Sequence, residues 1–338
     1  MARAAIDTSR GSAIRLLLMP LFMHALRKTR ETLAIYWVLA RIVAPITILT
    51  EMLSRMGAIE AIAPAFGPVM HVFGLPPELG LAWLSGLLIG IWGAIPLIYV
   101  LVPAADLSVG NITVFSALLL FAHGLPIEQK IIQKAGPALI VTTVLRLLGG
   151  VLYAFLLHRL LVATGWLASP VNPAWIPMNV EPGWGDFLLG LLETMATMLV
   201  IFLALSWMLD ILKATGLLDL MMRGLAPLLR LAGIRGEAGE FTAVGLLLGI
   251  SYGGGLLIRE ARSGAISPRQ IFLACVFMGF AHGVIEDTLV VMALGADPMG
   301  VLVGRLVFAV AATAAVSVQI GLLSESTFFR WAFSHVSI

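Results

Sequence analysis

The stretch FAHGLPIE occupies residues 121–128, and a second stretch, FAHGVIED, occupies residues 280–287. Their histidines, His123 and His282, lie 159 residues apart (282 − 123). In both stretches a glycine follows the histidine and a carboxylate comes soon after, although the surrounding sequence is strongly apolar. A motif that occurs twice in one chain indicates two copies of one structural unit.

The composition places the chain in a membrane. Of its 338 residues, 60% are hydrophobic and 12% are charged, whereas about 25% of the residues in soluble domains are charged. The net charge of +2 is small, which argues against a nucleic-acid partner. The single cysteine, Cys275, excludes an internal disulfide and a cysteine-based metal site. We therefore expect an all-α integral membrane protein, with the lipid bilayer as a partner and without a cofactor.

The offset of 159 residues extends beyond the two histidine motifs (282 − 123). GLLIGI from Gly86 aligns with GLLLGI from Gly245, and Arg146 aligns with Arg305, without a gap. Charged residues rarely match by chance between apolar stretches, so we interpret the repeat as real. It divides the chain into a basic N-terminal interfacial segment (1–32), a first repeat (33–163), an external linker (164–189), a second repeat (190–322) and a cytoplasmic C-terminal tail (323–338).

The positions of Lys and Arg predict opposite orientations for the two repeats, because cytoplasmic loops are enriched in these residues. In the second repeat, basic loops lie on both sides of the apolar segment 241–258. Both loops are then cytoplasmic, so this segment enters the membrane and returns. In the first repeat no Lys or Arg occurs between Arg55 and Lys130, so the matching segment, 81–100, enters from outside. The alternative is that every apolar segment spans the membrane.

The predicted fold is therefore two inverted-topology repeats, each with three transmembrane helices, one re-entrant hairpin and one interfacial helix. A re-entrant hairpin is allowed where protein or water covers its backbone, and glycine permits the tight reversal. The interfacial helices are predicted in residues 56–73 and 216–233. The candidate hairpin glycines are Gly90, Gly93, Gly249, Gly253 and Gly254. Because the N-terminus is basic, we expect it to be cytoplasmic in a multi-pass protein of a bacterial inner membrane.

The segments GLLIGIWG and GLLLGISYGGG, each followed by an apolar segment that ends in a His-Gly-acid motif, resemble the nucleoside-recognition (Gate) domain family. That family includes the spore maturation A and B membrane proteins. Its plan is similar to the membrane part of ferrous-iron permeases and, more distantly, to concentrative nucleoside transporters. The resemblance implies substrate or ion binding at His123, Gly124, Glu128, His282, Gly283, Glu286 and Asp287. This sequence shows no GTPase domain, and Ser116 stands at the repeat position of Cys275, so iron transport is not expected.

The ionisable residues of the two motifs are costly at membrane depth, which makes each a candidate functional group. A His–carboxylate pair can bind and release a proton near neutral pH. Ser251 and Tyr252, at the second glycine-rich turn, could contact a polar substrate, or the glycines could serve the turn alone. Arg146 and Arg305 could neutralise a carboxylate of their own repeat or bind a phosphate-bearing substrate. We favour a structural pairing for these two arginines.

Other interpretations of the histidine motifs stay open. The histidines could form structural hydrogen bonds at a tightly packed, glycine-lined helix crossing. A metal site is chemically feasible, but the two motifs lie in opposite halves, and we predict no bound metal. Pro126 is expected to break the helix in the first motif, whereas His282 and Glu286 share one face of the second if the helix continues.

Three functions fit these features. The first is a secondary transporter that moves a small polar or nucleoside-like solute by alternating access, coupled to H⁺ or Na⁺. The second is a transporter or flippase of a lipid or lipid-linked phosphate, which the arginine pair would suit. The third is a membrane scaffold or partner subunit, and the family resemblance also suggests a homo-oligomer such as a dimer. An enzyme is not expected, because the sequence shows no HExxH or Walker motif.

Overall fold

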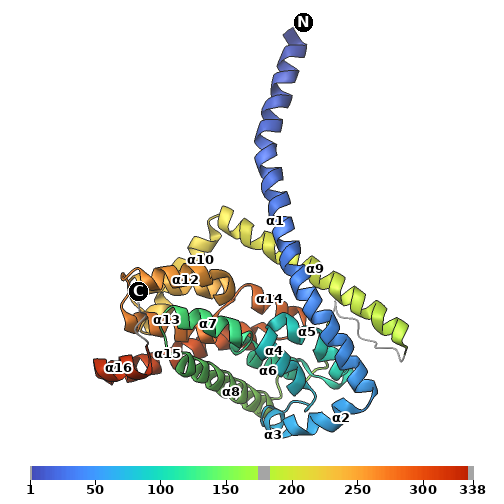
Figure 1. Cartoon of the computed structure of the whole chain (residues 1–338), viewed down its shortest axis with the longest axis vertical. Helices are drawn as coiled ribbons and strands as arrows, with labels where there is room; N and C mark the ends of the chain where they lie inside the picture. The colour runs from blue at the N-terminus through green and yellow to red at the C-terminus, as the bar shows by residue number, and fades with distance from the viewer. Residues whose placement is uncertain (1, 174–182, 334–338) are drawn as a thin grey trace.

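The structure is a computed structural model of the 338-residue chain, and it describes residues 2–173 and 183–333. These residues form helices joined by loops (Figure 1). Six of their helical stretches are long and apolar enough to cross a membrane: Leu26–Arg55, Val109–Lys134, Leu139–Thr164, Trp184–Leu212, Pro268–Ala293 and Met299–Leu322. Three of the six lie mainly in each predicted repeat, although Leu26–Arg55 and Trp184–Leu212 begin before its boundary. The chain is a multi-pass membrane protein.

Burial differs sharply among these six stretches. Val109–Lys134 and Pro268–Ala293 are mostly buried, whereas less than a third of the apolar core of each of the other four is buried. The exposed side chains include large apolar ones such as Leu148, Val307 and Leu322. A lipid bilayer covers such side chains without the cost that water would impose. The two buried stretches therefore form the centre of the protein, and the other four surround them.

Helix α1 (Ala2–Arg55) is continuous, so the chain has no helix break at the predicted boundary between residues 32 and 33. It crosses α9 (Trp184–Ala214), the first long helix of the second repeat (Figure 1). At this crossing Lys28 Nζ lies 3.1 Å from Asp210 Oδ1. The ion pair joins the basic N-terminal segment to the second repeat.

Each repeat contains two short helices that pack against each other as a helical hairpin. They are α4 (Leu79–Ile89) with α5 (Ile91–Leu101), and α11 (Glu237–Leu248) with α12 (Ile250–Arg262). The helices of each pair meet at one glycine, Gly90 with φ of 121° or Gly249 with φ of 82°. Glycine adopts these angles readily and other residues do not.

The other predicted hairpin glycines lie inside helices. Gly93 belongs to α5, and Gly253 and Gly254 belong to α12. The prediction that Gly93, Gly253 and Gly254 belong to the reversals is therefore wrong. The reversal uses Gly249 alone, because one residue with a left-handed φ is enough to end α11 and start α12.

Each buried stretch is divided into two helices at its histidine motif. In the first repeat, α6 (Val109–Phe121) ends before the histidine and α7 (Leu125–Lys134) begins after it. In the second repeat, α13 (Pro268–Ala281) and α14 (Glu286–Ala293) are separated in the same way. The long outer helices α8 (Leu139–Thr164) and α15 (Arg305–Leu322) follow, the latter after a π-helical turn at Met299–Gly304.

The break in the second motif corrects the expectation that only the first motif is broken. Gly124 and Gly283 adopt φ of 56° and 58°, in the left-handed region that glycine enters at little cost. Glycine therefore accounts for both breaks. Pro126 lies in the first turn of α7, where a proline is tolerated. His282 and Glu286 accordingly do not share one continuous helical face.

The segments predicted as interfacial helices differ from each other. Residues 56–73 form short turns in succession: α2 (Ala58–Ile62), η1 (Ala63–Phe66), α3 (Gly67–Met70) and η2 (His71–Phe73). Pro64 and Pro68 each lie at the start of a turn, because proline has no N–H to continue the preceding one. The counterpart, α10 (Leu217–Leu231), is one helix despite containing Pro227.

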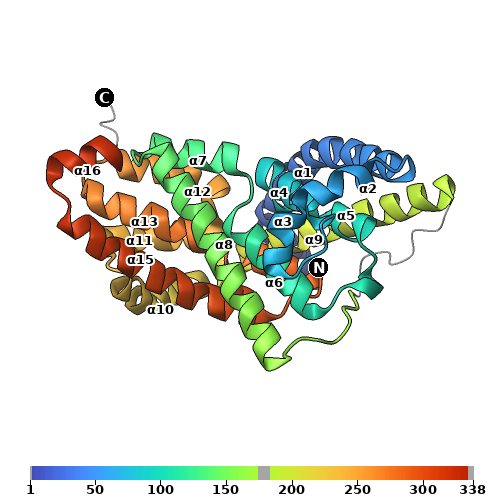
Figure 2. The same ribbon diagram turned by 90° about the horizontal axis from the view of Figure 1, so that it is seen from below.

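The two repeats interlock in space. Figure 2 shows α7 of the first repeat beside α12 of the second, and the two helices are in contact. The C-terminal tail contains α16 (Glu325–Trp331). Part of the predicted linker, residues 174–182, and the end of the tail, residues 334–338, lie outside the described residues.

Candidate functional site

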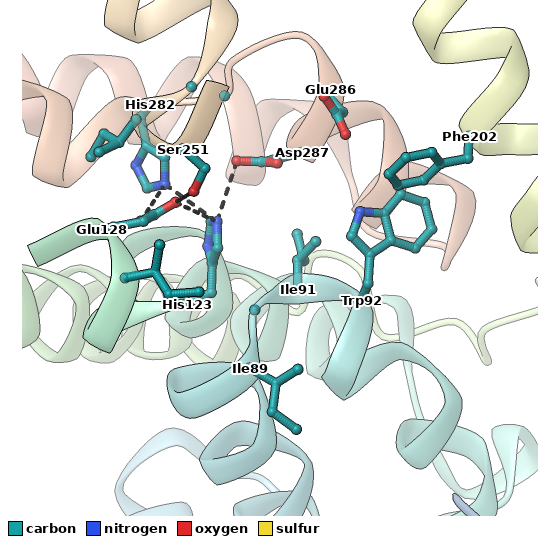
Figure 3. A pocket seen from close by; sticks show the side chains of 16 residues that line it. Ile89, Ile91, Trp92, His123, Glu128, Phe202, Ser251, His282, Glu286 and Asp287 are labelled. Atoms are coloured by element: carbon teal, nitrogen blue, oxygen red, sulfur yellow. Dashed lines mark hydrogen bonds and ion pairs between the residues drawn. The ribbon is translucent and has the colours of Figure 1, made fainter. Parts of the chain in front are cut away.

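The two histidine motifs and the two hairpin turns line one cavity of about 420 Å³ (Figure 3). The predicted site residues on its wall are His123, Gly124, Glu128, His282, Gly283, Glu286, Asp287, Ser251, Gly90 and Gly249. They come from both repeats. The two motifs, separated by 159 residues (282 − 123), therefore meet in the folded chain.

Each histidine ring is oriented by its own helix. The Nδ1 atom of His123 lies 2.9 Å from the Leu119 carbonyl, and that of His282 lies 2.9 Å from the Met278 carbonyl. A carbonyl only accepts hydrogen bonds, so each Nδ1–H donates. The opposite nitrogens, Nε2, then point toward each other across the interface between the repeats, 3.3 Å apart.

Glu128 of the first repeat reaches the histidine of the second. Its Oε2 atom lies 3.2 Å from His282 Nε2 and 2.7 Å from Arg146 Nη2. Its Oε1 atom accepts a hydrogen bond of 3.1 Å from the Ser251 hydroxyl, which stands near the start of α12. Glu128 is buried, and its partners come from both halves of the chain.

Asp287 makes the reciprocal approach. It occupies the repeat position of Glu128 (287 − 128 = 159), and its Oδ2 atom lies 3.6 Å from His123 Nε2. Each carboxylate thus faces the histidine of the other repeat. Glu286 precedes Asp287 and lines the same cavity, on the side nearer Trp92 (Figure 3).

The two buried arginines cap the broken helices. The Arg146 guanidinium donates to the carbonyls of Phe121 and His123, and Arg305 donates to the carbonyl of Phe280 at 2.9 Å. Arg305 also donates to the carbonyls of Leu120 and His282, at 3.0 and 2.9 Å. The last carbonyls of a helix lack partners within it, so the arginines satisfy groups that the breaks expose. Both side chains are 1% exposed, which leaves little of either guanidinium for a phosphate.

Residues 193–298 match the family model described as Gate, nucleoside recognition. This part of the chain is similar to a Gate domain. A relative from Bacillus subtilis (strain 168), described as the uncharacterized membrane protein YvoD, is 27% identical over 289 residues, which cover 83% of this chain and 90% of the relative. No solved structure matches the chain.

The matched Gate range contains the second hairpin and the second histidine motif. It begins inside α9 and ends at Pro298, just before the π-helical turn. The first hairpin and the first motif, which supply the facing half of the cavity, lie outside the match. Both repeats nevertheless have the same sequence of elements, namely a hairpin, a broken helix and a long outer helix.

Two aromatic residues of the cavity wall were not predicted as site residues. Trp92, near the start of α5, packs edge-on against Phe202 of the Gate range, with the ring centroids 5.1 Å apart. From the sequence alone, Trp92 is expected to be a packing residue, because it stands in an apolar segment. Its repeat position is that of Ser251 (251 − 92 = 159), and this match could have identified it. Phe202 lies in a uniformly apolar run that carries no such signal.

The remaining predicted residues contribute less to the cavity. Gly93 accepts a hydrogen bond of 2.9 Å from the Ser85 hydroxyl at its carbonyl, within the first hairpin. Gly254 lies close to Ile131 of α7, where the Gate range meets the first repeat. The side chain of Tyr252 lies outside the described residues.

The second hairpin contains one catalytic pattern, although no nucleophile elbow is expected from the sequence. Residues 249–253, GISYG, match the G-x-S-x-G pattern of a nucleophile elbow. That device requires a turn from a strand to a helix, and here the turn joins the helices α11 and α12. The Ser251 hydroxyl donates to a carboxylate, Glu128, and this contact differs from the serine–histidine pair of such enzymes.

Proposed function

We propose that the chain is a secondary transporter in which the cavity between the two repeats binds a small polar solute, of a nucleoside-like kind. The observation that carries this proposal is the convergence of both hairpins and both broken helices on one cavity. Inverted-repeat transporters bind their substrates near the membrane midplane, at the interface between the repeats and beside broken helices. The inverted orientation, the re-entrant hairpins and a cytoplasmic N-terminus in the inner membrane belong to this proposal.

The chemistry of the cavity favours a solute with a planar ring and polar edges. Its volume of about 420 Å³ lies within the range of roughly 300–1,000 Å³ that is usual for small-molecule sites. One wall carries Trp92 and Phe202, and the other carries the two histidines with Glu128 and Asp287 (Figure 3). An aromatic face suits a flat ring, and the carboxylates suit its hydroxyl or amino groups. A coupled H⁺ or Na⁺ would occupy the polar wall.

The lipid-phosphate alternative has less support. It depended on the arginine pair, but Arg146 is engaged by Glu128 and by backbone carbonyls. Arg305 is engaged by three backbone carbonyls. Both arginines are buried and neither lines the cavity, so a phosphate in the cavity would not reach them without a rearrangement.

Uptake into proteoliposomes tests the proposal. The purified chain is reconstituted, and the uptake of labelled nucleosides and related polar solutes is measured with and without H⁺ and Na⁺ gradients. Loss of a hydrogen bond to a charged group costs about 1.5–3 kcal/mol, which corresponds to a roughly 10- to 100-fold change in affinity. We expect an effect of this size for Glu128→Gln and Asp287→Asn.

Glu237→Gln is the matched control, because Glu237 is exposed and lies away from this cavity. The control variant should transport like the wild-type protein. Uptake that does not differ between the cavity variants and the control would overturn the assignment of the site. Absence of uptake for every solute, under every gradient, would favour the scaffold alternative.

A further inference from the structure

The Nε2 atoms of the two histidines lie close to each other and to carboxylate oxygens, so several hydrogen-bond acceptors converge at one point. Both Nδ1–H groups are committed to backbone carbonyls at 2.9 Å, so in the neutral rings each Nε2 carries a lone pair. His123 Nε2 faces His282 Nε2 at 3.3 Å and Asp287 Oδ2 at 3.6 Å. It also lies 3.8 Å from Glu128 Oε1. Arg146 Nη2 and the Ser251 hydroxyl already donate to two of these atoms, His282 Nε2 and Glu128 Oε1. The lone pairs that remain, on His123 Nε2 and Asp287 Oδ2, repel each other, and a bound cation would relieve this repulsion.

The distances suit a metal ion. A zinc ion lies about 2.0–2.1 Å from each ligating nitrogen in a tetrahedral site, which places two such nitrogens about 3.4 Å apart. The two imidazole nitrogens lie 3.3 Å apart, close to this value, and the Asp287 oxygen lies 3.6 Å from His123 Nε2. The ligand atoms of His123, His282 and Asp287 all lie within 4.8 Å of one another.

We propose that His123, His282 and Asp287 bind one divalent transition-metal ion, in a three-ligand site whose fourth position opens into the cavity. Imidazole and carboxylate ligands suit zinc and related ions, and three protein ligands with an open fourth position are typical of sites that also bind a substrate or water. The metal ion adds to the proposed function and rests on it, because the ion would lie in the same cavity as the solute.

The residues around the proposed ligands form the hydrogen bonds that usually orient the ligands of a metal site. Histidine ligands of metals usually donate their second ring N–H to a carbonyl or carboxylate, and both rings do so here. Arg146 Nη2 lies 3.1 Å from His282 Nε2, so the ion takes over that contact. Arg146 keeps its ion pair with Glu128 at 2.7 Å, which neutralises the guanidinium charge beside the ion.

The ion would join the two halves of the protein. His123 follows α6 of the first repeat, whereas His282 and Asp287 flank the break between α13 and α14 of the second. Separation of the repeats at this point would break at least one metal–ligand bond. The bound ion therefore holds the repeats together at the base of the cavity.

Metal binding to the full-length protein in detergent tests the inference without measuring transport. The protein is stripped with EDTA, dialysed and titrated with Co²⁺ by absorption spectroscopy and with Zn²⁺ by calorimetry. We expect one ion per chain and the intense visible bands of tetrahedral Co²⁺. His123→Asn and His282→Asn should each weaken binding at least about tenfold, since even the loss of a supporting partner costs 10–100-fold.

His71→Asn is the matched control, because His71 is exposed and lies away from the cavity. Asp287→Asn gives a second measurement if a histidine variant does not fold, and it should weaken binding and alter the Co²⁺ bands. Wild-type protein that binds no ion, or that loses binding equally with His71→Asn, would overturn the inference. Uptake that persists in EDTA, together with an absence of binding, would leave the proposed function intact. Metal binding without uptake of any solute would support the metal site and contradict the proposed transport function.

Discussion

Replacing Arg146 by methionine should strongly destabilise the protein. The guanidinium is 1% exposed, and its Nη2 atom lies 2.7 Å from Glu128 Oε2. Methionine retains much of the side-chain volume but leaves a buried carboxylate without its cation and two carbonyls without their donor. Breaking a buried ion pair by removing one partner typically costs about 3–5 kcal/mol. We expect a loss of unfolding free energy in this range.

A second substitution separates the effect of the unpaired charge on stability from the effect of altered packing. In the double variant Arg146→Met/Glu128→Gln no uncompensated charge remains, and replacing both members of a buried pair costs much less than breaking it. We therefore expect the double variant to be more stable than Arg146→Met alone. Arg305→Met is the matched comparison, since Arg305 donates to backbone carbonyls and forms no ion pair among the described residues.

The assay is thermal or denaturant-induced unfolding of the detergent-solubilised protein, followed by tryptophan fluorescence. The expected order of stability is wild type, then the double variant, then Arg146→Met. Adding Glu128→Gln to Arg305→Met should bring no comparable recovery, because that arginine does not pair with Glu128. An Arg146→Met protein that unfolds like the wild type would refute the reasoning. So would a double variant that is less stable than the single one.

Two further predictions concern the hairpins and the topology. Gly249→Ala should lower the free energy of unfolding by about 1–3 kcal/mol, because φ of 82° with ψ of 160° is nearly restricted to glycine. Gly255→Ala, in an open helical position, should leave the free energy of unfolding unchanged or raise it by up to about 1 kcal/mol. Unfolding measurements on both variants check this pair. Cysteines introduced at Asp106 and Arg262 should react with membrane-impermeant reagents from opposite sides of the membrane, and labelling of both from one side would contradict the inverted orientation.

The gapless repeat predicted much of the arrangement, because it rests on charged residues that rarely coincide by chance. Arg146 and Arg305 match in the sequence, and in the structure each donates to the carbonyls at a broken helix end. Contact between His123 and His282 could not be predicted in this way. It joins residues 159 positions apart (282 − 123), and local patterns do not specify which distant segments pack together.

Other features could not be predicted, because the same residue type in an apolar segment is compatible with two different structures. A glycine inside an apolar run is compatible with a continuing helix, so the break at Gly283 was not expected. A proline such as Pro126, in contrast, predicts a helix break. An aromatic residue in an apolar run usually indicates packing. Trp92 does pack against Phe202, and it lines the cavity as well. Only the structure distinguishes these roles.

The two carboxylates that match across the repeat have different surroundings, and this difference divides their roles. Glu128 is held by Arg146 at 2.7 Å and by the Ser251 hydroxyl at 3.1 Å. Asp287 approaches His123 at 3.6 Å, and its side chain is 13% exposed against 5% for Glu128. A carboxylate with two buried donors loses both of them if it moves to a ligand, whereas Asp287, 3.6 Å from a histidine nitrogen, loses little. Glu128 therefore connects the two halves of the protein, and Asp287 is the carboxylate better placed to bind what enters the cavity.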